Sequence, residues 1–187
     1  LCMAGGVALN CVANGKILRD GAFEDIWVQP AAGDAGGAVG VALAAYHKEL
    51  ENPRVVIKPD AMNGSYLGPS FSTKEIETAL DKCGGVYKTL EDDAVISTAA
   101  QALSEGKALG WFQGRMEFGP RALGGRSIVG DPRSESMQKN LNLKVKYRES
   151  FRPFAPSVLA ENVTDYFELD HTSPYMLLVD TVKENLR

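Results

Sequence analysis

A cluster of basic residues is the feature of this sequence most suited to chemistry. Nine Lys and Arg side chains and four Asp and Glu side chains fall between positions 115 and 152, so this span carries +5 in a chain of net charge −4. Arginines held in loops rich in glycine and proline can bind phosphate through two N–H groups at once. The span therefore predicts an anion site; the alternatives are a solvated basic face or structural arginine–carboxylate pairs. The nine residues are Arg115, Arg121, Arg126, Arg133, Lys139, Lys144, Lys146, Arg148 and Arg152.

Two glycine-rich turns are further candidates. Gly5 and Gly6 separate a short apolar run from an apolar stretch at helical spacing that includes Asn10. Such glycines let a phosphate or ribose approach the N–H groups at a helix start, although a tight strand–helix turn needs them too. In the second turn, Asp34 stands among glycines just before a helical stretch. Spacing alone favours an N-cap, and the alternative is a metal ligand or a carboxylate at a phosphate site.

Composition excludes several classes of protein. The chain has 187 residues, of which 44% are hydrophobic and 24% charged, as in globular proteins. No apolar run is long enough to cross a membrane, and an acidic chain is unsuited to coat nucleic acid, so neither a membrane nor a nucleic acid is an expected partner. Three cysteines without a CxxC pair argue against a disulfide framework or a zinc site, and predict a reduced, cytoplasmic setting.

The elements that must position these residues predict an α/β fold in two parts. Residues 1–49 alternate strand and helix, with strands at 1–4 and 26–29, a helix over 7–18 and a nearly uncharged, buried helix over 38–46. Because both ends of the chain fall beside predicted strands, we expect a fragment of a longer protein.

A polar stretch with several prolines and glycines, residues 50–71, predicts a linker and a domain boundary. Residues 72–187 predict a second α/β unit with a twisted mixed sheet. Its first helix starts at a capping box, Ser72 with Glu75 three residues later. Further helices are predicted over 92–104, 134–143 and 163–167, and strands over 86–90, 108–112, 156–160 and 175–179.

Four long motifs resemble the NodU/CmcH-type carbamoyltransferase family. Leu1-Cys-Met-Ala-Gly-Gly-Val-Ala-Leu-Asn-Cys-Val-Ala-Asn-Gly15 and Gln29-Pro-Ala-Ala-Gly-Asp-Ala-Gly-Gly-Ala38 resemble the end of the family's first domain. Gly110-Trp-Phe-Gln-Gly-Arg-Met-Glu-Phe-Gly-Pro-Arg-Ala-Leu-Gly124 and Lys144-Val-Lys-Tyr-Arg-Glu-Ser-Phe-Arg-Pro-Phe-Ala-Pro156 resemble the second. The resemblance implies that residues 1–49 are the remnant of an ASKHA-type domain and that residues 72–187 are a truncated YrdC-like domain.

The family resemblance also implies a two-step reaction. Carbamoyl phosphate and ATP give carbamoyl-adenylate, and the carbamoyl group then passes to a hydroxyl of a small molecule. Implied cofactors are ATP with Mg²⁺ and a divalent metal, iron in the family, with Asp34 as a metal ligand. Gly5, Gly6 and Asn10 match the nucleotide-side turn. The positions that match the carbamoyl phosphate site are Arg121, Lys146 and Arg152, with Arg115, Arg126 and Arg148 as second choices for ATP phosphates or structural pairs.

The sequence departs from the family pattern in ways that bear on activity. Gly125 stands where the family carries Asn, and the metal-binding His-x-x-x-His motif and the later Gly-Thr-Ala-Arg and Asn-Thr-Ser-Phe-Asn segments are missing. We therefore expect this chain alone to be unable to complete catalysis. Two other functions stay open: a carbamoyl-type transferase acting on tRNA or protein, which the acidic charge disfavours, and a non-catalytic phosphate- or nucleotide-binding module.

Overall fold

The computed structural model describes residues 1–187, which form two compact units that share a mixed α/β character. Unit 1 comprises Leu1–Gly68, Met116–Leu123 and Ser157–Arg187, and unit 2 comprises Pro69–Arg115 and Gly124–Pro156. The chain therefore passes between the units several times, and the predicted linker over 50–71 belongs almost wholly to unit 1. No helix has the length and apolar character that a membrane span requires.

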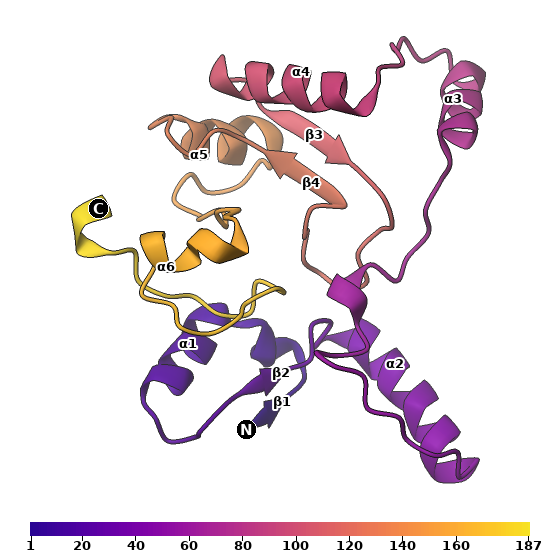
Figure 1. Cartoon of the computed structure of the whole chain (residues 1–187), viewed down its shortest axis with the longest axis vertical. Helices are drawn as coiled ribbons and strands as arrows, with labels where there is room; N and C mark the ends of the chain where they lie inside the picture. The colour runs from indigo at the N-terminus through magenta and orange to yellow at the C-terminus, as the bar shows by residue number, and fades with distance from the viewer. The chain divides into compact units, whose positions relative to one another are not determined.

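Unit 1 opens with a small parallel sheet and the helix that connects its strands. Strand β1 (Cys2–Met3) pairs with β2 (Trp27–Val28) in the register Cys2↔Trp27. Between them lie a 3-10 helix, Gly6–Leu9, and helix α1 (Cys11–Arg19). Asn10 begins α1 as its N-cap, because its side chain accepts a hydrogen bond from the Ala13 N–H at 3.1 Å. The strand–turn–helix–strand order expected from the sequence is confirmed, with shorter strands (Figure 1).

The C-terminal segment packs against α1 and completes the core of unit 1. Ala8, Val28, Ala32 and Leu177 form its buried apolar cluster. The segment holds helix α6 (Val163–Tyr166) and an isolated bridge between Phe167 and Val182, but no strand over 175–179. The predicted strand there is wrong because side chains, rather than a neighbouring strand, satisfy these carbonyls. Asn14 on α1, 2% exposed, donates to the Leu177 carbonyl at 3.0 Å, and Arg19 donates to the Val179 carbonyl at 2.9 Å.

Helix α2 (Asp34–Ala44) continues into a π-helical turn, Ala45–Glu49, and none of its residues is buried. Val41 is 72% exposed and Leu43 52% exposed. The helix forms where the sequence predicts it, but the expectation of burial is wrong, because no other element of unit 1 covers its apolar side chains. Helices that are apolar on all sides normally lie inside a protein.

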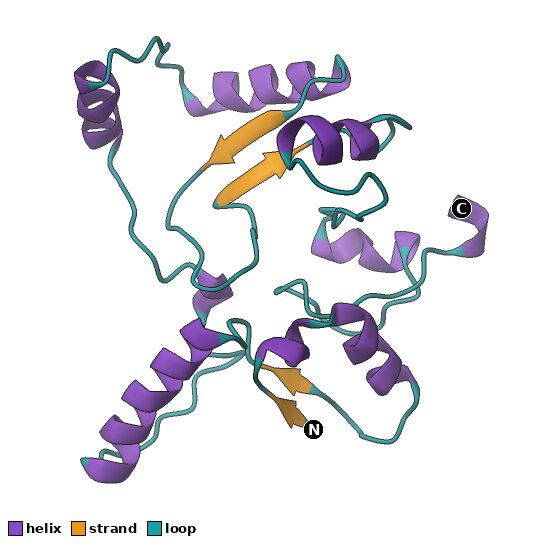
Figure 2. Ribbon diagram, turned by 180° about the vertical axis from the view of Figure 1, so that it is seen from behind, coloured by secondary structure: helices purple, strands orange, loops and turns teal.

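Unit 2 is built on one antiparallel strand pair with helices beside it (Figure 2). Strand β3 (Leu109–Phe112) pairs with β4 (Arg126–Val129), and helix α4 (Asp92–Ser104) contacts β3. Helix α5 (Met137–Asn140) continues through a π-helical turn, Leu141–Val145. The helix over 92–104 and the strand over 108–112 are confirmed.

The expected twisted mixed sheet does not form in unit 2. Its sheet has two strands, and residues 86–90 and 156–160 are not strands. Val86 is fully exposed, so the run from 86 to 90 has β-forming residues but neither a partner strand nor a buried face. Strand propensity reflects packing on a half-buried surface, and without that surface the propensity has no effect.

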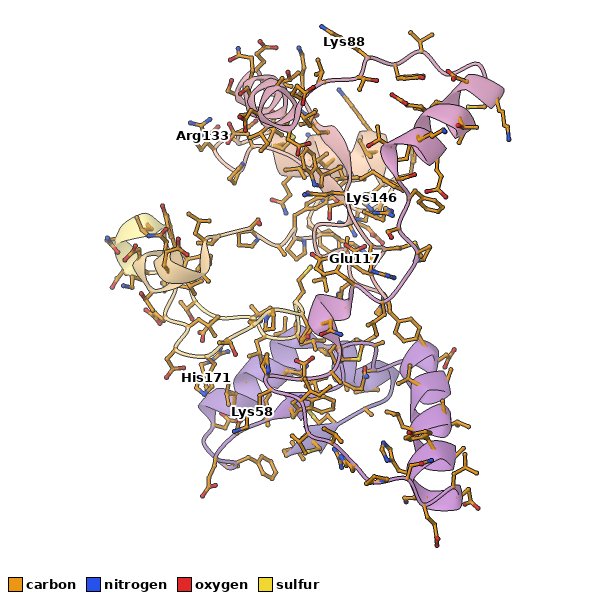
Figure 3. The ribbon with its side chains drawn as sticks, turned by 45° about the vertical axis from the view of Figure 1, so that its right-hand side comes forward. Lys58, Lys88, Glu117, Arg133, Lys146 and His171 are labelled. Carbon is orange, nitrogen blue, oxygen red and sulfur yellow. The ribbon has the colours of Figure 1, made fainter.

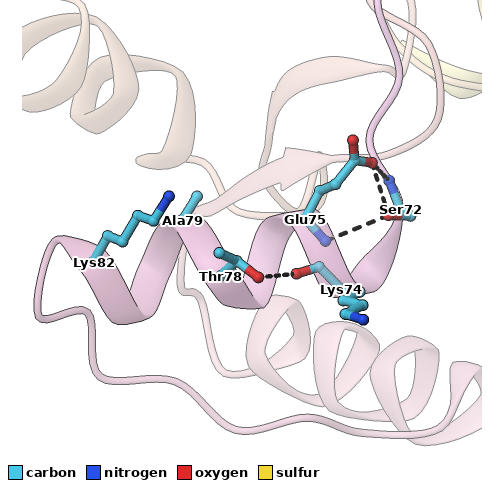
Figure 4. A pocket seen from close by; sticks show the side chains of 6 residues that line it. All are labelled: Ser72, Lys74, Glu75, Thr78, Ala79 and Lys82. Carbon is cyan, nitrogen blue, oxygen red and sulfur yellow. Dashed lines mark hydrogen bonds between the residues drawn. The ribbon is translucent and has the colours of Figure 1, made fainter.

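Helix α3 (Thr73–Lys82) confirms the predicted capping box (Figure 4). The Glu75 N–H donates to Ser72 Oγ at 3.3 Å, and the Ser72 N–H donates to Glu75 Oε2 at 2.8 Å. The pKa of the Glu75 carboxyl is lowered by the Ser72 N–H and, to a smaller extent, by the Ser72 hydroxyl, which donates to Glu75 Oε2 at 2.7 Å. A hollow on this face of α3 contains none of the residues predicted to bind anions or nucleotides.

We expect Gly15→Ala to destabilise unit 1, although alanine normally favours a helix. A Cβ at Gly15 would lie 2.3 Å from the Val179 carbonyl oxygen, so the C-terminal segment would have to move away from α1. The overpacking should cost about 1–3 kcal/mol of unfolding free energy in urea denaturation followed by circular dichroism. Gly40→Ala is the matched control, because nothing lies within 4 Å of its Cβ. The control should gain about 0.5–1 kcal/mol, and equal gains in both variants would contradict the packing of this segment.

Candidate functional site

The loop after α5 carries two of the three residues predicted to bind carbamoyl phosphate. Lys146 is the C-cap of the π-helical turn, its N–H donating to the Leu141 carbonyl at 2.9 Å. Its side chain, labelled in Figure 3, is exposed, and it forms no hydrogen bond or ion pair. Arg152 lies six residues further on and donates from Nε to Glu149 Oε2 at 2.8 Å. A guanidinium has five N–H donors, so four on Arg152 are available to an anion.

Glu149 holds the Arg152 side chain without enclosing it. Both side chains are about half exposed, at 53% for Glu149 and 52% for Arg152. The pKa of the Glu149 carboxyl is lowered, first by its own backbone N–H and then by the charges of Arg152 and Arg148. The carboxylate is therefore ionised at neutral pH, and it orients a cation that remains accessible.

Two second-choice residues use their guanidinium groups within the protein. Arg126 donates from Nη1 to the Gln113 and Gly125 carbonyls at 3.1 and 2.7 Å, and its Cζ lies 3.3 Å from the Phe112 ring centroid. Arg148 donates from Nε to Asn142 Oδ1 at 2.6 Å and lies over the Phe154 ring. Both side chains fix the ends of loops. The third, Arg115, is exposed at the end of the first segment of unit 2.

Arg121 lies in unit 1, whereas Lys146 and Arg152 lie in unit 2. Its Nη2 donates to the Leu9 carbonyl at 2.6 Å, immediately before Asn10, and its buried Nε has no hydrogen-bond partner. The structure thus brings Arg121 beside the predicted nucleotide-side turn. A common anion site for all three cations remains a prediction.

The segment that carries Arg121 is fixed to unit 1 by its backbone. The Phe118 N–H donates to the Ser65 carbonyl at 2.6 Å. Gly119, at φ +115°, lies so close to Ala31 that an added Cβ would be 2.9 Å from the Ala31 Cβ. Gly5, at φ +95°, donates its N–H to the Ala32 carbonyl at 2.6 Å, while Gly6 opens the 3-10 helix. These contacts place one arginine and both glycines around the start of α1.

Asp34 is the first residue of α2 rather than its N-cap. The N-cap is Gly33, and no side chain bonds the free N–H groups there, so the N-cap interpretation is wrong. A carboxylate in the first turn still interacts favourably with the helix dipole. No group of three His, Cys, Asp or Glu side chains in the structure could hold a metal ion. Asp34 alone does not fit a metal centre, so metal binding stays a prediction and no chemical step below depends on it.

Sequence reasoning missed the residue that organises the basic loop, Asn142. It is 0% exposed and hydrogen-bonds to three residues of the following loop. A signal was present in the sequence, since an asparagine interrupts the apolar run Leu141-Asn-Leu143 within a predicted helix. A buried polar side chain must find partners, and here they lie in the predicted anion site.

Arg133 belongs to the basic span but is paired with its neighbour. Its Nη2 lies 2.7 Å from Asp131 Oδ2. The side-chain bonds from Arg133, and after them its backbone N–H, lower the pKa of Asp131 to about 2.

We expect Arg133→Ala to raise the pKa of Asp131 only part of the way to its ordinary 3.8, because the backbone N–H of residue 133 remains. The pair stabilises the fold above pH 4 and loses that effect as the pH falls toward 2. A ¹³C carboxyl titration by NMR measures this, and an unchanged pKa in the variant would contradict the pair.

Comparison with known proteins identifies the family. Residues 1–43 match the family model described as Carbamoyltransferase N-terminus, and residues 100–187 match Carbamoyltransferase C-terminus. The uncharacterized protein sll1178 of Synechocystis is 65% identical over 189 residues, which cover 100% of this chain and 31% of that protein.

Two relatives carry names that describe a role. Nodulation protein NolO of Bradyrhizobium diazoefficiens is 47% identical, with 98% of this chain and 34% of that protein covered. The 3'-hydroxymethylcephem-O-carbamoyltransferase of Amycolatopsis lactamdurans is 34% identical, with 99% and 33% covered. The chain spans about a third of the length of these relatives. It belongs to the carbamoyltransferase family, as its motifs indicated.

Proposed function

We propose that this chain is part of an ATP-dependent O-carbamoyltransferase that acts on a hydroxyl of a small molecule. The carbamoyltransferase family and the named O-carbamoyltransferase relative support the class of reaction. The observation that carries the proposal is the basic loop of unit 2, where Lys146 is unpaired and Arg152 keeps four N–H donors. In this proposal residues 1–49 are ASKHA-type, residues 72–187 are YrdC-like, and the protein works in the cytoplasm.

The proposed reaction has two steps. Carbamoyl phosphate, ATP and one water molecule give carbamoyl-adenylate, phosphate and pyrophosphate. The acceptor hydroxyl then attacks the carbamoyl carbon, and AMP leaves as the carbamate ester forms. ATP enters with Mg²⁺, and the Gly5–Gly6 turn with Asn10 faces the nucleotide.

Lys146 and Arg152 have a simple role in the first step. Carbamoyl phosphate is a small dianion, and negative charge builds up on the departing phosphate oxygens. Cations fixed before the reaction stabilise that charge without reorganising. Arg152 can form two parallel N–H···O bonds to phosphate, while Lys146 supplies a compact positive charge.

We expect calorimetric titration of the chain with carbamoyl phosphate to show saturable binding that Arg152→Ala weakens at least about tenfold, since hydrogen bonds between charged groups contribute about 1.5–3 kcal/mol. Arg133→Ala is the matched control. It also removes an exposed arginine from unit 2, but one that is held to Asp131 through both Nε and Nη2. The control should bind as the unaltered chain does.

Circular dichroism of all three proteins shows whether each is folded. A folded chain that binds no carbamoyl phosphate would overturn the assignment of this loop to the anion site. Equal weakening in both variants would mean that the loss reflects net charge, and not a contact made by Arg152.

A further inference from the structure

We propose that Asn142 is a positioning residue that holds the loop of Lys146 and Arg152 in the conformation that binds the anion. This inference rests on the proposed function, because it assigns a role within the same site. The residue does not contact the anion in this proposal. It acts through the backbone on both sides of Arg152 and through Arg148.

The Asn142 side chain is fully used. Its Nδ2 donates to the Arg152 carbonyl at 2.8 Å and to the Ser150 carbonyl at 3.2 Å, and its Oδ1 accepts from Arg148 Nε at 2.6 Å. Its own carbonyl accepts from the Arg148 N–H at 3.0 Å. One amide with no exposed surface thus fixes three positions of a loop without regular secondary structure. A buried amide that loses such partners pays the cost of desolvation, so these bonds are strongly favoured.

Gln138, one helical turn before Asn142, donates further hydrogen bonds to the same loop. Its Nε2 donates to the Arg152 carbonyl at 3.1 Å and to the Phe151 carbonyl at 3.3 Å. Residues four apart lie on one face of a helix, so the side-chain amides of Gln138 and Asn142 both reach the same loop segment, residues 150–152. The Arg152 carbonyl therefore receives two donors, and the residue is held at its main chain while its guanidinium stays half exposed.

The arrangement matches what an anion site needs. Long, flexible cations lose conformational entropy when they bind, and that loss is smaller when their backbone is already fixed. On the other side of the loop, Arg148 bonds Asn142 and stacks on the Phe154 ring, 4.9 Å from its centroid. Both ends of the segment from Lys146 to Phe154 are thereby fixed to one helix. A role in stability alone is the competing explanation.

The test compares Asn142→Asp with Asn140→Asp by calorimetric titration with carbamoyl phosphate. Asp at position 142 keeps the volume and the acceptor for Arg148 but loses both donors to the loop. Asn140 is exposed on the same helix and bonds only the Ser136 hydroxyl, so its variant controls for the added negative charge. We expect Asn142→Asp to bind at least about tenfold more weakly and Asn140→Asp to bind within about twofold of the unaltered chain.

A second variant and a spectroscopic signature separate positioning from stability. Gln138→Ala removes exposed donors to the same carbonyls and should weaken binding by about threefold. In ¹H–¹⁵N spectra, the Arg152 Nε–H resonance of the unaltered chain should move as carbamoyl phosphate is added. In Asn142→Asp it should need at least about tenfold more ligand, while resonances outside the loop stay in place.

The outcomes are distinct. If the unaltered chain binds and Arg152→Ala does not, but Asn142→Asp binds as well as the unaltered chain, the positioning role is wrong and the proposed function stands. If the unaltered chain is folded and does not bind, the anion site fails and the role of Asn142 fails with it. If Asn142→Asp and Asn140→Asp weaken binding equally, charge explains the effect and positioning is overturned.

Discussion

The structure depends on a single constraint, the need of a buried side-chain amide for hydrogen-bond partners. In each unit a helical asparagine meets it. Asn14 on α1 donates to the Ala8 and Leu177 carbonyls, and Asn142 after α5 donates to the Ser150 and Arg152 carbonyls. These are among the most completely buried side chains of the chain. Because an unpaired buried amide is costly, each asparagine binds an irregular segment to one helix.

This constraint links the fold to the proposed chemistry. The apolar core of unit 1 is small, built on residues such as Ala8 and Ala32, and it cannot by itself fix a C-terminal segment without strands. In unit 2, the loop of Lys146 and Arg152 likewise contains no strand that could fix it. Both segments have defined conformations because polar side chains replace the strand partners they lack. A binding loop held in this way keeps its own charged side chains available.

The sequence predicted what local signals encode. The capping box at Ser72, the helix over 92–104 and the strand over 108–112 depend on neighbouring residues, and all three are confirmed. The strands expected over 86–90 and 175–179 depend on a distant partner that the structure does not supply. The site follows the same rule. Its cations could be named from motifs, but the hydrogen bonds of Asn142 to the loop and of Arg121 to the Leu9 carbonyl depend on tertiary packing.

The number of basic residues between 115 and 152 is therefore larger than the number that can bind an anion directly. A residue that does not bind the anion can still attract it by its charge. Arg133 is neutralised by Asp131 and adds little to the local field. Arg148 is different, because the Asn142 amide and the Phe154 ring that hold it are neutral. Its charge persists and still lowers the pKa of Glu149. Charge acts over about 8–10 Å at physiological salt, whereas a hydrogen bond needs a free donor at about 3 Å. In the proposed site, Arg148 can thus draw an anion toward the loop while Lys146 and Arg152 bind it.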